Sequence, residues 1–203
     1  MVKPYQLTRE SRYLGLPLGF GFLGVTYALS AYSYAQPYFL GTATPYIQLV
    51  LRAFAFLFLV VTYLFSKKTE NARWLWDTIL VFLVIALIVS FILVTVPDVD
   101  LPDYLTTSAY VRVLNLVCIA YICAHTLKTH IEKPDPETIW IPFAYLFFGI
   151  SQYSLMIYAL DSSMSAFWGA LAIRWVGLAI FLFIAYKAFY SAKKGRFDEA
   201  NTP

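Results

Sequence analysis

The segment DTILVFLVIALIVSFILVTVP, residues 77–97, decides the fold class of this chain. Between Asp77 and Pro97 it contains no charged residue, and nearly every side chain is aliphatic or aromatic. The hydrocarbon core of a bilayer is about 30 Å thick, which an α-helix crosses in about 20 predominantly apolar residues. We therefore expect residues 77–97 to form a membrane-spanning helix.

The same criterion predicts five further spans, at about residues 13–34, 46–66, 106–127, 138–160 and 165–190. The gaps between them are short, rich in Pro, Gly and acidic residues, and too short to hold another domain. We therefore expect an all-α integral membrane protein. Residues 1–203 would form a single domain of six transmembrane helices, arranged as three consecutive helical hairpins.

Composition supports a membrane protein over a soluble one. Of the 203 residues, 60% are apolar and only 13% are charged, whereas a soluble domain carries roughly a quarter of charged residues. The net charge is only +3 and no long basic run occurs, which argues against a nucleic-acid partner. Membrane lipid is the partner that this composition predicts.

The distribution of Lys and Arg predicts the orientation. The gaps near 35–45, 98–105 and 161–164 contain no Lys or Arg. The other gaps and both ends are basic, and because cytoplasmic loops carry the excess of Lys and Arg, we expect both termini in the cytoplasm, with the cell membrane as the location. The basic residues are Lys3, Arg9, Arg12, Lys67, Lys68, Arg73, Lys128, Lys133, Lys193, Lys194 and Arg196.

Two patterns suggest an internal repeat of about 60 residues. Pro17 and Gly24 in the first span have the same spacing as Pro142 and Gly149 in the fifth. The second, fourth and sixth spans each carry one arginine near their start, at Arg52, Arg112 and Arg174, with separations of 60 and 62 residues. We favour a duplication of one hairpin. The alternative is that six helices with short loops have such a period by chance.

The three arginines are the main candidate site. Each is expected on the order of 10 Å below the outer membrane boundary, where an isolated charge costs about 2 kcal/mol or more. Gln48 precedes Arg52 by one helical turn and Asn115 follows Arg112 by one turn, so both amides are candidate companions. The arginines would bind an anion, a lipid phosphate or the carboxylate of a partner. Alternatively, each snorkels to the headgroups or pairs with the acidic outer loops.

Glycines are candidates for close helix packing. Gly15 and Gly19 have the small-xxx-small spacing that allows two helices to approach closely. Such a face would pack the first span against the fifth, which carries Gly149, or would serve as a docking face for another subunit. The full candidate set is Gly15, Gly19, Gly21, Gly24 and Gly149.

No catalytic or cofactor constellation is apparent. His125 and His130 are five residues apart, whereas a metal pair on a helix prefers three or four. Asp77 is expected to cap the helix that it opens, and no Asp or Glu lies in the middle of a span. No phosphate-binding loop, nucleophile elbow or paired-histidine motif occurs. We expect no enzymatic activity, no cofactor and no bound metal.

Three functions remain open at this point. A non-catalytic accessory subunit of a larger membrane complex, of respiratory or metalloenzyme type, fits well-formed spans with short loops, and its partners would be other integral membrane subunits. A small channel or transporter for an anionic or neutral solute would use the outer arginines. A membrane sensor domain without an output module is the third.

Overall fold

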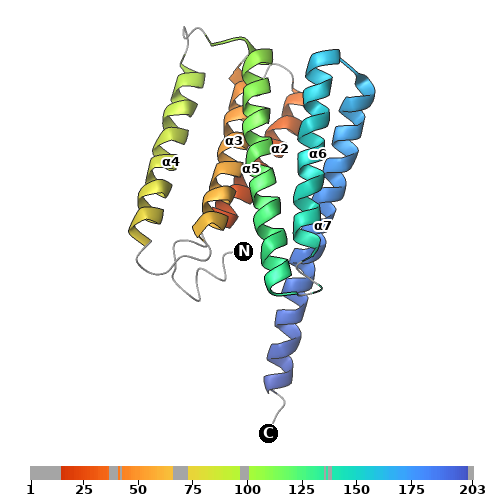
Figure 1. Ribbon diagram of the computed structural model, residues 1–203. Helices are drawn as coiled ribbons and strands as arrows, with labels where there is room; N and C mark the ends of the chain where they lie inside the picture. Colours follow the sequence, from red (N-terminus) through yellow and green to blue (C-terminus); the bar gives the residue numbers. More distant parts are fainter. Residues whose placement is uncertain are drawn as a thin grey trace. The chain divides into compact units, whose positions relative to one another are not determined.

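The structure is a computed structural model that describes residues 15–36, 41, 43–65, 73–96, 101–134, 136 and 139–200 (Figure 1). Its regular structure within these residues is all α-helical. The six helices are α2 (Gly15–Ala35), α3 (Ala43–Phe65), α4 (Arg73–Thr95), α5 (Tyr104–Glu132), α6 (Trp140–Asp161) and α7 (Met164–Ala200).

The predicted all-helical fold with six helices is confirmed. Five of the helices, α3 to α7, are long and apolar enough to cross a membrane. Helix α2 is not among these five, because its four glycines, Pro17 and three tyrosines dilute an otherwise apolar sequence. Helix α7 continues to Ala200, past the predicted end at 190, through residues rich in the helix formers Ala and Lys.

Helix α4 begins four residues before the predicted third span, and the predicted capping role of Asp77 is wrong. Helix α4 begins at Arg73, so Asp77 lies in its second turn, and the first turn contains no acidic residue. Asp77 therefore does not cap the helix. The reason is tertiary packing: Trp76 is 2% exposed and packs edge-on against Phe65 of α3, at 5.8 Å between ring centroids. This contact fixes the backbone in the turn that precedes Asp77.

Helix α5, in contrast, starts at an acidic cap. The Asp103 carboxylate accepts hydrogen bonds from the backbone N–H of Thr106 at 3.0 Å and from its hydroxyl at 3.1 Å. The bond from the Thr106 backbone, and then that from its side chain, lower the pKa of Asp103 below the ordinary value of 3.8. A lowered folded-state pKa means that the cap stabilises the protein at neutral pH. This contribution is lost as the pH falls through the folded-state pKa.

The chain divides within α5 into two compact units, residues 1–118 and 119–203. In the first unit, α3 lies between α2 and α4 and packs against both. Phe56, Phe58 and Leu59 of α3 are at most 1% exposed, and Phe58 stacks on Phe22 of α2 at 5.6 Å between centroids. Helix α3 is thus the core element of this unit.

The glycines of α2 explain how closely it approaches α3. A Cβ on Gly19 would lie 2.6 Å from Leu59 Cγ and 3.0 Å from the backbone oxygen of Ala55, and a Cβ on Gly15 would collide with the Thr62 hydroxyl. The small-residue face therefore packs against α3, the next helix in the chain. The reason is that Ala55, Leu59 and Thr62 form one face of α3 at helical spacing. The use of the small-residue face against the fifth span or as a docking face for another subunit stays a prediction.

The other candidate glycines have looser surroundings. A Cβ on Gly21 or Gly24 would meet no atom within 4 Å, and one on Gly149 would make only an ordinary contact with Ile119, at 3.4 Å. Among the described residues, no close helix packing therefore depends on these three positions.

In the second unit, α6 packs along α7. The ring of Phe181 on α7 lies against both Tyr145 and Phe148 of α6, at 5.0 and 5.8 Å between centroids. A Cβ on Gly177 would lie 3.2 Å from the Ala144 backbone oxygen, so this pair also has a close approach. Ser162, which ends α6, adopts the left-handed conformation with φ 52°.

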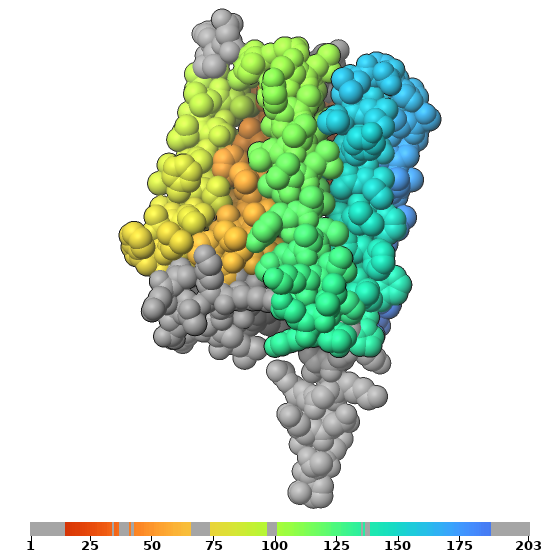
Figure 2. All heavy atoms as spheres, viewed as in Figure 1, coloured from red at the N-terminus to blue at the C-terminus, as the bar shows by residue number. Residues whose placement is uncertain are grey.

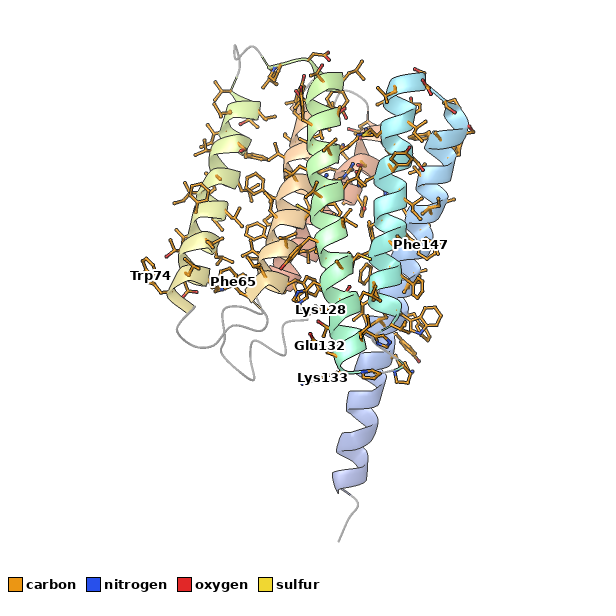
Figure 3. The ribbon with its side chains drawn as sticks, in the orientation of Figure 1. Phe65, Trp74, Lys128, Glu132, Lys133 and Phe147 are labelled. Atoms are coloured by element: carbon orange, nitrogen blue, oxygen red, sulfur yellow. The ribbon has the colours of Figure 1, made fainter. Side chains whose placement is uncertain are left out.

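Helix α4 forms the most exposed apolar surface of the first unit. Only 6% of its most apolar window is buried, compared with 50% for α3. Figure 2 shows the yellow α4 side chains at the surface, and Figure 3 shows Trp74, which is 76% exposed, pointing away from Phe65. This surface suits contact with lipid chains.

Candidate functional site

The side chains of the three candidate arginines are buried to different degrees. Arg174 of α7 is only 8% exposed, whereas Arg52 of α3 and Arg112 of α5 are half-buried. The Nε atom of Arg52 and the Nε and Nη1 atoms of Arg112 are nevertheless inaccessible to solvent. A snorkelling arginine keeps its guanidinium at the surface. The burial of Arg174 argues against the snorkelling alternative for this residue.

A hydrogen bond between helices fixes Arg174. Its Nε donates to Ser151 Oγ of α6 at 3.1 Å, and Ser151 is fully buried. Packing positions this pair, because the close approach at Gly177 lies one turn further along α7 and brings the two helix backbones together. The result is a buried arginine of α7 whose Nε is hydrogen-bonded to a neutral hydroxyl of α6.

Gln152 follows Ser151 and is the second polar residue of this interior. It is 0% exposed, and neither its Oε1 nor its Nε2 has a hydrogen-bond partner among the described residues. A buried polar group without a partner costs about 1–3 kcal/mol. Buried amides nearly always have a partner in native proteins, so each exception needs an explanation such as a ligand or water.

Gln48, the predicted companion of Arg52, has hydrogen-bond partners on α2. Its Oε1 accepts from the Ser30 hydroxyl at 2.9 Å, and its Nε2 donates to Ser33 Oγ at 3.4 Å. Ser30 also lies 2.9 Å from the Thr26 backbone oxygen. The amide therefore ties α2 to α3 and has its hydrogen-bonding capacity largely used.

Asn115, the predicted companion of Arg112, is fully buried in the first unit. Neither of its amide atoms has a hydrogen-bond partner within the described part of the chain, so no hydrogen bond joins it to Arg112. Asn115 therefore resembles Gln152 in chemistry, and each belongs to its own unit. That the three arginines form a single site stays a prediction, since Arg52 and Arg112 belong to the first unit and Arg174 to the second.

The histidines lie near the C-terminal end of α5, beside a charged surface. His125 lies against Tyr121, at 6.1 Å between ring centroids. Lys128, Glu132 and Lys133 are exposed at the end of α5 (Figure 3). Within the residues that the structure describes, no three His, Cys, Asp or Glu side chains gather into a group that could hold a metal ion.

Sequence reasoning found Arg174 but missed Ser151 and Gln152 as its surroundings. A signal was present: Ser151-Gln152 interrupts an apolar stretch near the middle of a predicted span, where a polar pair is costly unless it is used. The prediction concentrated on charge and overlooked the neutral amide.

Comparison with protein-family models, with characterised proteins and with solved structures finds no match to this chain.

Proposed function

We propose that this chain is a small channel or transporter for an anionic or neutral polar solute. The observation that carries the proposal is the buried polar group of the α6–α7 pair. Arg174 is 8% exposed, Ser151 and Gln152 are 0% exposed, and the Gln152 amide lacks a hydrogen-bond partner among the described residues. Polar residues inside a membrane bundle are expensive and typically mark a solute pathway. Transporters commonly bind their substrates near the bilayer midplane.

The proposal includes six crossings with both termini in the cytoplasm, in the cell membrane. Helix α2 would be the sixth crossing, since its 21 residues are long enough and it packs along α3. Cysteine labelling tests this arrangement in a Cys118→Ala, Cys123→Ala background. We expect Gln36→Cys and Ser163→Cys to react with an impermeant maleimide on intact cells, and Lys133→Cys to react only after lysis. Reaction of Gln36→Cys and Ser163→Cys from opposite sides would contradict the arrangement.

Flux into liposomes tests the solute pathway. Reconstituted protein should conduct small anions or small neutral solutes, such as chloride, acetate, lactate and urea, above the rate of protein-free liposomes. The triple variant Arg52→Gln, Arg112→Gln, Arg174→Gln should reduce this flux at least about tenfold, because charge steers and binds the solute. Gly24→Ala, which adds a methyl where no atom lies within 4 Å, is the matched control. Absence of flux in the wild-type protein would contradict the proposal.

An accessory subunit of a larger membrane complex is our second candidate. The apolar surface of α4 favours it, since only 6% of the most apolar window of that helix is buried within the chain. The helices of a neighbouring subunit would pack against this surface in place of lipid chains. Purification in a mild detergent, followed by identification of co-eluting chains, tests this role. A chain that elutes alone and conducts solute would exclude it.

A further inference from the structure

The Gln152 amide defines what a ligand of the α6–α7 pair must offer. It lies near the middle of the Trp140–Asp161 helix and is 0% exposed. Its Nε2 needs a hydrogen-bond acceptor and its Oε1 needs a donor, and neither has one among the described residues. A ligand that satisfies both atoms carries a donor and an acceptor close together.

Arg174 adds a charge requirement to the same stretch of α6. Its Nε is bonded to Ser151, the residue adjacent to Gln152. A guanidinium is a planar fork of N–H donors that matches a carboxylate, and the attraction strengthens where water is excluded. The guanidinium beside Ser151 therefore suits the carboxylate of a small anion.

The neighbouring side chains set the remaining character of the ligand. Phe148, Leu155 and Ala170 are at most 7% exposed in the same helix pair, and all three are apolar. Apolar neighbours of this kind suit the carbon atoms of a small organic ligand. A bare inorganic halide, in contrast, has no donor for Gln152 Oε1.

We propose that Arg174, Ser151 and Gln152 form a binding site for a small organic carboxylate that also carries a hydroxyl or ammonium donor, such as a 2-hydroxy acid or an amino acid. Arg174 binds the carboxylate, and Gln152 accepts a hydrogen bond from the hydroxyl or ammonium group while donating to an oxygen. Ser151 holds the guanidinium in place. This inference rests on the proposed function, since it names the class of solute that the pathway takes.

Thermal unfolding of the purified full-length chain in detergent tests the site, with lactate, serine, acetate and lactamide as probes. Lactate or serine at ten times its dissociation constant adds RT ln 11 to the unfolding free energy and should raise the midpoint by about 3–6 °C. Acetate lacks the donor and lactamide lacks the charge, so both should bind at least about tenfold more weakly. Absence of a shift with both lactate and serine at 10 mM would overturn the proposal.

Two variants separate a binding role from a structural role. Arg174→Lys keeps the charge without the fork and should weaken lactate or serine binding at least about tenfold. Gln152→Leu should abolish the preference over acetate, yet raise the ligand-free midpoint by about 3–6 °C, because it removes an amide without a partner. A lowered ligand-free midpoint in Gln152→Leu would overturn the proposal. Thr26→Ala is the control, in which the ligand-induced shift should persist.

The flux experiment tests transport and the unfolding experiment tests the binding site, so either claim can be contradicted without the other. Conduction of chloride or urea without any shift by lactate or serine would leave the proposed function and overturn this site. A lactate-induced or serine-induced shift that depends on Gln152, in a protein that conducts nothing, would leave the site and overturn transport.

Discussion

The α2–α3 pair and the α6–α7 pair share their packing and differ in their polar residues. When Pro17 is aligned with Pro142, and Arg52 with Arg174, Gly19 and Ala55 correspond to Ala144 and Gly177. Each pair has its close approach at these aligned residues. In the α2–α3 pair it runs from Gly19 to the Ala55 backbone oxygen, and in the α6–α7 pair from Gly177 to the Ala144 backbone oxygen. The glycine lies on the first helix of one pair and on the second helix of the other.

The polar residues do not correspond in the same way. Thr26 aligns with Ser151 and both are fully buried, but Thr26 donates to the Phe22 backbone oxygen of its own helix, whereas Ser151 accepts from Arg174. The bonded set Ser30, Ser33 and Gln48 aligns with Leu155, Tyr158 and Ala170. One pair therefore uses its amide to join helices, and the other keeps its amide, Gln152, without a protein partner in the described residues.

The two pairs share a close helix approach and differ in their polar residues; that they arose by duplication of one hairpin stays a prediction. Small residues at the crossing serve stability in both pairs. In the α2–α3 pair the Gln48 amide is hydrogen-bonded to Ser30 and Ser33, and in the α6–α7 pair the Gln152 amide is where we propose that a ligand binds.

The largest expected effect is at the crossing. Gly19→Ala should destabilise the protein by about 1–3 kcal/mol, because the new Cβ would lie 2.6 Å from Leu59 Cγ and 3.0 Å from a backbone oxygen. Gly177→Ala should cost less, since its nearest atom is 3.2 Å away. Thermal unfolding in detergent measures both.

Gly24→Ala is the matched control within α2, because its Cβ would meet no atom within 4 Å. It should leave stability unchanged or raise it slightly through helix propensity. If Gly19→Ala and Gly24→Ala behave alike, the close approach of α2 and α3 is not what holds this pair together.

The helices were predictable because an apolar stretch of about 20 residues, such as 77–97, has the length that crosses a bilayer as a helix. The start of α4 was not predictable from the sequence, because the contact of Trp76 with Phe65 outweighs the capping preference of Asp77. The neighbour of the Gly15 and Gly19 face was also missed, because spacing identifies a face without naming what it contacts.

The candidate site was predictable only in its charged part. Arg174 stands out in a span because its charge is costly there, and the sequence therefore singles it out. Whether the Arg174 side chain reaches the headgroups or turns into the helix pair depends on two tertiary features. These are its bond to Ser151 and the close approach of the α6 and α7 backbones that Gly177 allows. The state of Gln152 depends on every neighbour that could have bonded it, and a single sequence does not list those neighbours.

A loss of stability of intermediate size is expected when the aligned hydroxyls of Ser151 and Thr26 are removed. Ser151→Ala removes the acceptor from the buried Arg174 Nε and should cost about 1–2 kcal/mol, since a charged donor loses its partner. Thr26→Ala removes only a bond within its own helix and should cost less than about 1 kcal/mol. Unfolding midpoints of both variants measure the difference. Equal losses would show that the two hydroxyls have the same role.

The smallest effect is expected at the left-handed residue that follows the first helix of each pair. Gly41 has φ 55° and Ser162 has φ 52°, so one connection uses glycine at this conformation and the other uses serine. Ser162→Gly should stabilise the protein by about 1 kcal/mol or less, because a left-handed residue with a side chain is strained by about 1–2 kcal/mol and the added chain entropy offsets part of the gain. Gly41→Ala should destabilise it by about 1 kcal/mol for the same reason. Unfolding midpoints that move in opposite directions would show that both connections impose the same backbone geometry. A loss of stability in Ser162→Gly would instead mean that the serine side chain contributes more than its backbone strain costs.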